Sequence, residues 1–514
     1  QTGCIGFCQE EPLVEMVADG RPRVMYRKIT PDRILDAIED FRSGRFEKKK
    51  WIFGQMPDPR SLIDKGVENP LAEVAPLEKM AAFDANPFYA KQVKIALRNC
   101  GYIDPDSIEE YIARGGYRAF FKALHDYNPA DIINEVKASG LRGRGGGGFP
   151  TGIKWATCAK HDGERSIICN ADEGDPGAYM DRSILEGDPH SVLEGMLIAG
   201  VAIGSSHGYL YVRNEYPLAV KRLVTAIKQA EAYGLVGDNI GGTDFSFHFK
   251  ISRGAGAFVC GESTALMASL EGKVGRPRAK YVHTVEKGFR EGPSNLNNVE
   301  TYANIAPILL KGGKWYAAMG TEHSKGTKVF SLCGKIKNTG LVEVPMGVTL
   351  REIVSDVGGG VPKNKAFKAV QTGGPSGGCI PERFLDLPVD YQRLAEVGSI
   401  MGSGGMIVMD QDTCMVDVAR YFLDFLKEES CGQCNPCREG IKQMLAILTR
   451  ICAGDGREGD IEQLEELGSM VQKISLCGLG TAAPNPVLTT ILYIRNEYEE
   501  HISENKCRAG VCKN

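Results

Sequence analysis

The sequence has little of three features that each mark a broad class of protein. It carries 61 Lys and Arg against 65 Asp and Glu, so no excess of positive charge favours nucleic acid or an anionic membrane as a partner. No apolar run approaches the ~18 residues of a membrane span, and the first residues lack the basic and apolar regions of a signal peptide. Its 16 Cys among 514 residues are too few for a disulfide scaffold, and clustered thiols in a reducing cytosol more often bind metal. We therefore expect a cytoplasmic protein with bound metal, no nucleic-acid partner and no membrane span.

The length predicts roughly three or four domains, and 43% hydrophobic residues suffice to form a core in each. The first residue is Gln and the last stretch is CRAGVCKN, so we expect a fragment of a longer polypeptide. Residues 1–25 have the size of a domain remnant. Residues 26–95 show helical periodicity that charged and Pro-containing stretches interrupt, which predicts a connector.

The rest of the chain divides into three parts by its patterning. Residues 96–327 alternate strand-like runs such as SIICNA, GYLYVRNE and FSFHFKI with helical runs, which predicts βα units around a largely parallel sheet. Residues 328–412 contain short strands around one helix, typical of a small α+β module. Residues 413–500 are helical throughout, which predicts a bundle of about four helices.

A cysteine motif gives the sharpest chemical signal. Cys431, Cys434 and Cys437 form C-x2-C-x2-C, and Cys477 follows in a distant loop. Three thiolates from one tight turn and a fourth from elsewhere are a common way to hold a [4Fe–4S] cluster. Four cysteines also suit tetrahedral zinc, but zinc ribbons usually pair two C-x2-C units. The spacing therefore favours the cluster.

A glycine-rich segment, GLRGRGGGGFPTGIKW, spans residues 140–155. Consecutive glycines expose backbone N–H groups to a phosphate or a flat ring, and Arg144 and Lys154 add positive charge. The alternative is a flexible linker. It is disfavoured because Phe149, Pro150 and Trp155 follow at once, and linkers are seldom bounded by such anchors.

Polar residues follow the strand-like run SIIC in the segment NADEGDPGAYMDR, residues 170–182. Its carboxylates could form a magnesium site or a solvated turn. Polar groups at the carboxyl end of a parallel strand face the crevice where α/β sheets bind ligands, which favours contact with a cofactor or nucleotide. Weaker signals follow in GAGAFVCGES (254–263), PRAK (277–280) and NNVET (297–301).

Together, and in this order, these segments resemble the NADH-binding flavoprotein subunit of respiratory complex I, the 51-kilodalton or F-type subunit. They resemble its soluble relatives more closely: the B-type subunits of NAD-linked and electron-bifurcating hydrogenases and the counterparts in formate dehydrogenases and tungsten benzoyl-CoA reductases. The resemblance covers about residues 110–500. It implies a multidomain α/β fold with a Rossmann-like FMN/NADH domain (96–327), a ubiquitin-like β-grasp insert (328–412) and a four-helix iron–sulfur domain (413–500).

The resemblance also implies site residues, motif by motif. Those that would line FMN are Gly143, Arg144, Gly145, Gly146, Gly147, Gly148, Lys154, Asn170, Asp172, Glu173, Gly261, Asn297 and Asn298. Phe149 would stack on NADH, and Glu262 and Lys280 would reach the dinucleotide. The family's hydride transfer needs no acid or base from the protein, so no catalytic side chain is expected.

This sequence departs from the family pattern at three positions. Ser263 stands where the family has a second Glu, Asp175 replaces the Glu of a Glu-Pro pair, and the usual Phe shortly after Lys280 is replaced near His283. In the family the missing Glu is expected to repel the 2′-phosphate of NADP. Strict preference for NAD over NADP is therefore not expected here.

Both ends of the chain resemble parts of neighbouring domains. Cys4 and Cys8 in residues 1–25 look like the closing half of a thioredoxin-like [2Fe–2S] domain, so this chain alone is not expected to bind that cluster. Residues 501–514 resemble the start of a ferredoxin-like C-terminal extension. Cys507 and Cys512 could belong to it or be idle thiols.

The alternative for Cys507 and Cys512 at the C-terminal end is a zinc site. Cys507 and Cys512 form C-x4-C, and His501 precedes them by six residues. Three thiolates and one imidazole suit a closed, structural zinc ion. The site we predict consists of Cys452, His501, Cys507 and Cys512, in which Cys452 is assigned only from its place at a helix end.

The resemblance implies a protein that oxidises NADH, or reduces NAD⁺, at FMN and exchanges single electrons with the [4Fe–4S] cluster. It implies partners in a larger redox complex: a small thioredoxin-like [2Fe–2S] subunit and a catalytic hydrogenase, formate dehydrogenase or benzoyl-CoA reductase subunit. Simple and electron-bifurcating flavin chemistry both fit. Two alternatives remain at this point, an electron-relay or scaffold subunit with a decayed flavin site and a quinone reductase that acts alone.

Overall fold

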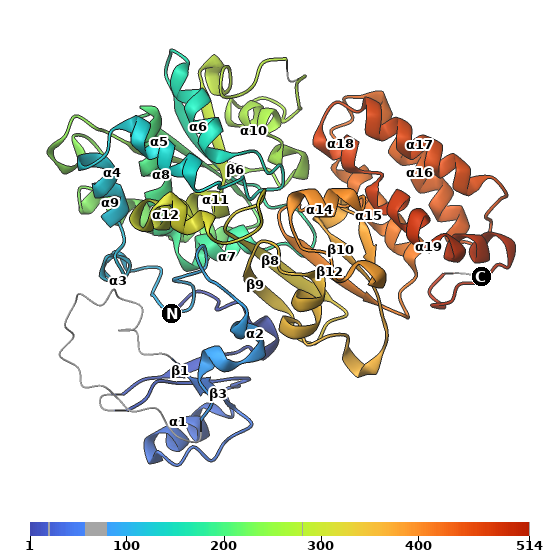
Figure 1. Cartoon of the computed structure of the whole chain (residues 1–514), viewed down its shortest axis with the longest axis horizontal. Helices are drawn as coiled ribbons and strands as arrows, with labels where there is room; N and C mark the ends of the chain where they lie inside the picture. The colour runs from blue at the N-terminus through green and yellow to red at the C-terminus, as the bar shows by residue number, and fades with distance from the viewer. Residues whose placement is uncertain (19–20, 57–79, 280, 513–514) are drawn as a thin grey trace.

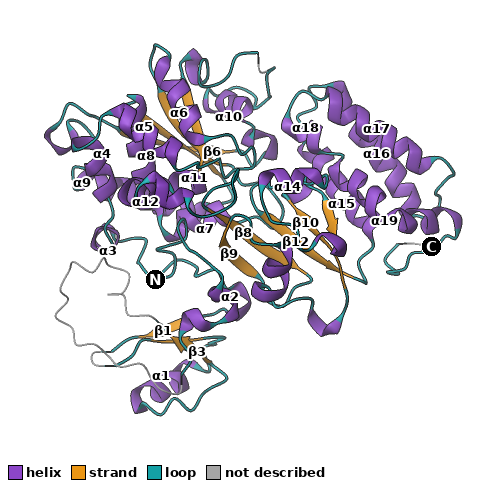
Figure 2. Ribbon diagram, in the orientation of Figure 1, coloured by secondary structure: helices purple, strands orange, loops and turns teal. Residues whose placement is uncertain are grey.

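The computed structural model describes residues 1–18, 21–56, 80–279 and 281–512. Three sheets and one group of helices follow one another along the chain (Figure 1). In Figure 2 the largest group of helices surrounds the parallel sheet, a second sheet occupies the centre, and the C-terminal helices lie beyond it. None of the helices in the described ranges is both long and apolar enough to cross a membrane.

The N-terminal sheet joins residues that we predicted to lie in two different parts. Strands β1 (Val14–Met16), β2 (Val24–Tyr26) and β3 (Ile52–Gln55) pair antiparallel in that order. Helix α1 (Ile34–Ser43) contributes Ala37 and Phe41 to the small core beside them and ends at Gly44, whose φ of 66° is left-handed.

The boundary predicted between residues 25 and 26 is therefore wrong, because it cuts through β2. Residues 57–79 of the predicted connector lie outside the described part of the chain.

The four-stranded sheet that follows the N-terminal sheet along the chain is fully parallel, as the alternation of strands and helices predicted. Its order is β6 (His248–Gly254), β5 (His207–Arg213), β4 (Ser166–Ala171) and β7 (Ser294–Asn298). Strand β7 has the sequence SNLNN, which carries no strand signal and gains its place by pairing with β4.

Helix α8 (Pro189–Ile203) forms the centre of this domain. It has no exposed polar face, and every residue except Val201 is buried, including His190 and Glu194. Asp188 caps its first turn by accepting the N–H of Ser191, and Gly204 ends it with a φ of 74°.

The remaining helices of this part lie around α8 or connect the strands. They are α3 (Ile108–Ala113), α4 (Arg118–His125), α5 (Pro129–Ala138), α6 (Thr151–Lys160), α7 (Met180–Gly187), α9 (Pro217–Ala232), α10 (Ser263–Leu270), α11 (Val299–Ala303), α12 (Ile305–Lys311) and α13 (Gly313–Ala317). The short helix α2 (Pro87–Ala90) instead packs against the central module through Phe88 and Tyr89.

The central module contains a five-stranded sheet in the order β11 (Cys379–Pro381), β10 (Phe367–Thr372), β12 (Gly405–Asp410), β8 (Thr327–Gly334) and β9 (Gly340–Pro345). Strands β8 and β12 are parallel, and the other pairs are antiparallel. A helical segment at Glu352–Val357 and helix α14 (Tyr391–Glu396) complete the module.

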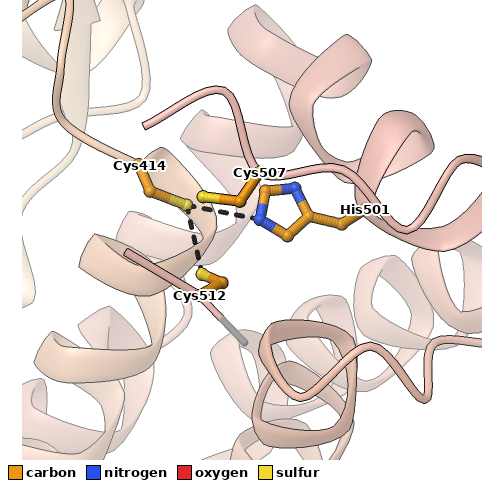
Figure 3. Close-up of side chains that lie close together, drawn as sticks. All are labelled: Cys414, His501, Cys507 and Cys512. Carbon is orange, nitrogen blue, oxygen red and sulfur yellow. Dashed lines mark hydrogen bonds between the residues drawn. The ribbon is translucent and has the colours of Figure 1, made fainter. Parts of the chain in front are cut away.

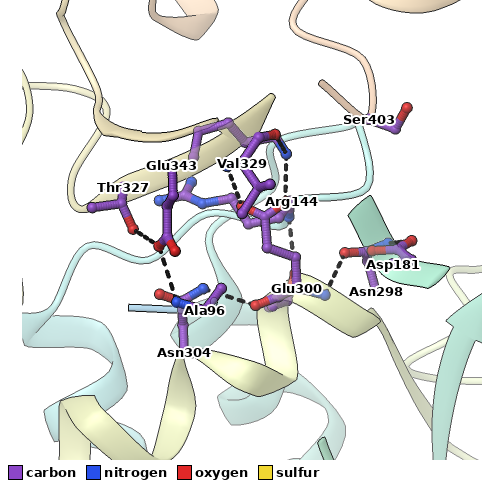
Figure 4. Close-up of polar contacts among 12 residues, drawn as sticks. Ala96, Arg144, Asp181, Asn298, Glu300, Asn304, Thr327, Val329, Glu343 and Ser403 are labelled. Atoms are coloured by element: carbon purple, nitrogen blue, oxygen red, sulfur yellow. Dashed lines mark hydrogen bonds and ion pairs between the residues drawn. The ribbon is translucent and has the colours of Figure 1, made fainter. Parts of the chain in front are cut away.

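Buried carboxylates join the central module to the parallel-sheet domain (Figure 4). Lys328 on β8 donates to Glu300 on α11, and the exposed fractions of these side chains are 0% and 1%. Glu300 also accepts the N–H of Val329 at 2.9 Å. Because an unpaired charge would be costly at this depth, the pair fixes α11, and with it the end of β7, against β8.

The C-terminal part is helical, as predicted. Its helices are α15 (Met415–Glu429), α16 (Asn435–Cys452), α17 (Asp460–Ile474), the short α18 (Gly478–Ala482) and α19 (Asn485–Ser503). Helix α19 extends three residues into the predicted C-terminal extension. Pro436 lies in the first turn of α16, where its missing N–H costs nothing, so the helix starts directly after Cys434.

Candidate functional site

The predicted flavin segments meet at the carboxyl edge of the parallel sheet. Asn170 and Asp172 lie at the end of β4, and Asn297 and Asn298 end the neighbouring strand β7. The glycine-rich loop faces this edge: a Cβ atom at Gly145 would stand 2.9 Å from Cβ of Asn298. Only a residue without a side chain allows this approach.

A turn from the segment GAGAFVCG completes the edge. The side-chain amide of Asn170 donates to the carbonyl of Gly261 at 2.9 Å, which ties the turn to the end of β4. Four segments that lie far apart in the sequence are thus brought together here.

Two buried oxygens at this edge accept no hydrogen bond within the described part of the chain, Asp172 Oδ2 and Asn297 Oδ1. Buried polar atoms are almost always paired, so these two indicate a ligand that donates hydrogen bonds. The hydroxylated chain of FMN supplies such donors, and the bare glycine loop suits its phosphate. The residues present therefore fit FMN.

A cavity beside the loop has an empty volume of about 580 Å³. Phe149, Lys154 and Ser263 line it together with His283, Thr284 and Leu296. Phe149 is 53% exposed although it is a large apolar residue, so its ring is available to a ligand. Ser263 and His283, two of the three departures from the family pattern, therefore face the same space.

Arg144 does not add charge to the open face of the loop, contrary to the prediction. Its side chain is fully buried and donates to the carbonyls of Lys325 at 2.6 Å and Arg142 at 3.2 Å and to the hydroxyl of Tyr316 at 3.1 Å. Both terminal nitrogens of the guanidinium find acceptors inside the protein, whereas the buried Nε has no partner among the described residues, so Arg144 supports the loop from within the protein (Figure 4).

Two of the predicted acidic residues are used to cap helices. Glu173 accepts the N–H groups of Asp181 at 3.0 Å and Arg182 at 3.1 Å at the start of α7. Glu262 accepts the N–H groups of Thr264 at 2.8 Å and Ala265 at 3.0 Å at the start of α10. Both carboxylates hold the backbone of segments at the site. Lys280 lies outside the described residues.

The other two carboxyl groups have raised pKa values. Burial raises the pKa of Asp172 to about 7, although Arg213 lies 3.6 Å away and lowers it. Burial also raises the pKa of Asp175 to about 6, opposed by the hydroxyl of Ser403, which donates to it at 2.5 Å. Ser403 belongs to the central module, so this module contributes to the edge of the site.

Cys431, Cys434, Cys437 and Cys477 surround one cavity, as predicted. The first three come from the loop between α15 and α16 and from the first turn of α16, and Cys477 immediately precedes α18. The cavity has an empty volume of about 280 Å³, and Val259, Pro277, Leu476 and Leu479 close it with apolar groups. Burial raises the pKa of Cys437 to about 11, so positively charged metal is needed to hold its thiolate.

A second cysteine group lies at the opposite end of α15, because Cys414 precedes this helix whereas Cys431 follows it. Figure 3 shows its four side chains. The ligand atoms of Cys414, His501, Cys507 and Cys512 all lie within 4.8 Å of one another. Sγ of Cys414 is 3.7 Å from Sγ of Cys512 and 3.5 Å from Nε2 of His501. Tetrahedral zinc with Zn–S bonds of ~2.3 Å requires sulfur–sulfur distances of about 3.8 Å, so this group suits a single ion.

The predicted ligand set is corrected at one position, because Cys414 and not Cys452 belongs to this group. Cys452 was assigned from its place at the end of α16. Cys414 lies 87 residues before His501, at the start of α15, and no spacing in the sequence connects the two. Nδ1 of His501 lies 2.6 Å from the carbonyl of Glu497, which leaves Nε2 for the metal.

A third group contains Cys4, Cys8 and Glu11. Sγ of Cys8 lies 3.5 Å from the hydroxyl of Tyr179, which follows the acidic loop of the flavin site. The N-terminal segment therefore packs close to the predicted FMN residues. That this chain alone binds no [2Fe–2S] cluster stays a prediction.

Comparison with known proteins gives consistent results for both halves of the site. Residues 136–307 match the Nuo51 FMN-binding domain, and residues 417–501 match the NADH-ubiquinone oxidoreductase-F iron–sulfur binding region. The second match contains Cys431, Cys434, Cys437 and Cys477.

Individual relatives cover most of the chain. The NADP-reducing hydrogenase subunit HndC of Solidesulfovibrio fructosivorans is 54% identical over 82% of this chain and 86% of its own length. An F-type subunit of the NADH-quinone oxidoreductase of Rhizobium meliloti is 43% identical over 80% of this chain and 98% of its own. The crystal structure of an NAD⁺-reducing [NiFe]-hydrogenase in the H₂-reduced state aligns with a TM-score of 0.71 and 30% identity, over 98% of this chain and 77% of that one.

Proposed function

The chain belongs to the family of NADH-oxidising FMN and [4Fe–4S] flavoproteins that includes the F-type subunit of NADH-quinone oxidoreductase, and on this premise we propose which residues hold its cofactors and what it assembles with. It is a flavin-dependent NAD(P)H oxidoreductase subunit.

The flavin site we propose consists of the glycine loop and the two strand ends opposite it. The backbone N–H groups of Gly145 to Gly148 bind the phosphate, and Asp172 and Asn297 accept hydrogen bonds from the ribityl hydroxyls. The observation that carries this assignment is the pair of buried oxygens without donors beside a loop that has no side chains. When bound, FMN accepts a hydride from NADH and releases its electrons one at a time.

The dinucleotide site is the cavity beside the loop. Phe149 offers its exposed ring for stacking, and Lys154 is positioned in the same cavity to attract phosphate. Ser263 leaves this cavity without the carboxylate that would repel a 2′-phosphate. The protein binds and orients the substrate here, and the apolar residue Leu296 helps to exclude water.

Cys431, Cys434, Cys437 and Cys477 are the cluster ligands in this proposal. The turn Phe258–Gly261 runs between the two sites: Gly261 accepts from Asn170 at the flavin edge, and Val259 lines the cluster cavity. The N–H of Phe258 donates to Glu429, two residues before Cys431, at 2.8 Å. One short turn thus separates the electron donor from the acceptor.

Two finer structural assignments belong to the same proposal. The central module is a ubiquitin-like β-grasp fold, supported by its parallel pair β8 and β12 at the centre with antiparallel neighbours, and the parallel-sheet domain is Rossmann-like. Cys414, His501, Cys507 and Cys512 hold a structural zinc ion, supported by their mutual distances. The ion fixes the segment after α19 to the start of α15.

We further propose that the chain works in the cytoplasm as one component of a multisubunit, NAD(P)-linked redox complex. None of the 16 cysteines, all within the described part of the chain, forms a disulfide, which fits a reducing compartment. The similarity to a hydrogenase subunit over four-fifths of the chain favours a hydrogenase as the catalytic partner over formate dehydrogenase or benzoyl-CoA reductase. A small thioredoxin-like [2Fe–2S] subunit is the other expected partner.

Cofactor content tests the assignments together. The purified full chain should release one FMN on acid treatment and contain four iron atoms in its cluster, and Cys477→Ala should lose the iron but keep the flavin. Asp172→Leu, a change at the flavin site, should lose the flavin but keep the iron. Iron retained by Cys477→Ala would contradict the ligand set.

A further inference from the structure

Tyr391 belongs to the central module, yet its side chain contacts the glycine loop of the parallel-sheet domain. Its hydroxyl donates to the carbonyl of Gly143 at 2.7 Å. Its ring packs so closely under Gly148 that a Cβ atom there would stand 2.6 Å from Cε1, and the φ of Gly148 is +59°. The loop can follow this path only because residue 148 is glycine.

Arg142 contacts the same ring and closes the loop. Its guanidinium lies 4.2 Å from the ring centroid of Tyr391, a cation–π distance. Nε of Arg142 donates to the carbonyl of Gly148 at 2.5 Å, and the N–H of Gly143 donates to the carbonyl of Phe149 at 2.9 Å. The two ends of the loop are therefore tied together, with Tyr391 at the junction.

The central module holds the site at two further points. Gly146 forms an isolated β-bridge with Gly402, and Ser403 donates to Asp175. Helix α14 begins with Tyr391, and the preceding Asp390 caps it by accepting the N–H of Arg393 at 2.7 Å and also accepts the hydroxyl of Thr321 at 3.0 Å. The contacts to the loop thus come from an ordered element.

We propose that Tyr391 is a positioning residue for the flavin: it fixes the conformation of Gly143–Gly148, so that the central module controls FMN affinity and the potential of the bound flavin. This inference rests on the flavin site proposed above. A loop rich in glycine has a high conformational entropy when free, and ordering it on binding lowers affinity. Tyr391 orders the loop beforehand by donating to the carbonyl of Gly143, and Arg142, which lies over its ring, holds the carbonyl of Gly148, so that the backbone dipoles of the loop keep a fixed direction.

The test compares Tyr391→Phe with Tyr493→Phe in the full chain, each stripped of FMN and titrated with FMN by fluorescence quenching. Tyr493 is a matched control: its hydroxyl donates to the carbonyl of Val397 at 3.1 Å, and Arg383 lies 4.9 Å from its ring centroid. Tyr391→Phe should raise the Kd for FMN about fivefold, the equivalent of one hydrogen bond of ~1 kcal/mol, and Tyr493→Phe should stay within about twofold.

A redox titration of the bound flavin is the second measurement, because a merely structural tyrosine would change stability without changing the potential. The midpoint potential should shift in Tyr391→Phe and stay at the wild-type value in Tyr493→Phe. Unchanged affinity and potential in Tyr391→Phe, or equal effects of the two variants, would overturn the inference.

Two further outcomes are separable. If Tyr391→Phe does not fold, Arg142→Lys replaces it as the test variant. Arg142→Lys keeps a cation at the ring but loses the hydrogen bond from Nε to the carbonyl of Gly148, so it should also weaken FMN binding. Wild-type affinity for FMN in this variant would count against the inference. Failure of the wild-type chain to bind FMN would refute the proposed flavin site, whereas normal wild-type binding with an unaffected Tyr391→Phe refutes only the role of Tyr391.

Discussion

Replacing Cys414 by serine tests the corrected zinc site, since the sequence pattern alone would have chosen Cys452. In the structure, Cys414 is the member of the group that lies at the start of α15, and it lies 3.7 Å from Cys512 and 3.5 Å from His501. The wild-type chain should contain about one zinc ion, and Cys414→Ser should lose it. The matched control, Cys452→Ser, removes a buried thiol from the same bundle and should keep the zinc.

The expected loss can be estimated from the ligands. Structural zinc sites bind with apparent free energies of about 10–16 kcal/mol, and removing one of four ligands removes a large part of this. The ion joins the segment around Cys507 and Cys512, which has little core of its own, to the bundle. Cys414→Ser should therefore release zinc to a chelator at low concentration and expose the residues after Ser503 to proteolysis.

The assay is metal analysis by inductively coupled plasma mass spectrometry, followed by limited proteolysis with and without chelator. Zinc bound by Cys414→Ser but absent from Cys452→Ser would refute the geometric assignment. A wild-type chain that is free of zinc but protected from cleavage after Ser503 would refute the site altogether.

Two predictions concern the flavin and dinucleotide sites. Ser263→Glu should raise the ratio of kcat/KM for NADH to that for NADPH by about tenfold or more, because a carboxylate in the cavity with Lys154 and His283 repels the 2′-phosphate; an unchanged ratio would remove Ser263 from the account. In the folded state the pKa of Asp172 is raised from 3.8 to about 7, so between these pH values the folded state keeps a proton that the unfolded state releases. The free energy of unfolding should therefore fall as the pH rises from 4 to 7. The pKa shift corresponds to a loss of about 4 kcal/mol in the free energy of unfolding. Urea unfolding of the FMN-free chain should show a smaller loss over this pH range in Asp172→Asn than in the wild type, and equal pH dependence in the two would contradict the assignment.

Periodicity and motif spacing predicted the parts of the molecule that depend on local sequence. The strands at Ser166–Ala171 and His207–Arg213 each contain a short run of apolar and aromatic residues, and the C-terminal helices carry apolar residues at helical spacing. The cluster cysteines were found because three of them lie within seven residues. Each of these signals is contained in a short segment.

The features that sequence reasoning missed depend on distant contacts. Strand β7 has four polar residues around one leucine, and it exists because β4 offers a pairing edge. Arg144 looked like a phosphate-binding cation, but Tyr316 and Lys325, more than 170 residues away, take up its donors. Cys414 and Tyr391 carry no motif, and only the packing of α15 and α14 brings them to the metal group and to the glycine loop.

The central claim is that electrons from NADH reach the cluster of Cys431, Cys434, Cys437 and Cys477 through the flavin at the glycine loop. Electron paramagnetic resonance of the full chain, frozen after anaerobic mixing with NADH, measures this directly. The account predicts a reduced [4Fe–4S] signal in the FMN-loaded chain, no signal in the FMN-free chain, and recovery when FMN is added back. A cluster that NADH reduces equally well without FMN, or that stays oxidised in the FMN-loaded chain although dithionite reduces it, would contradict the claim.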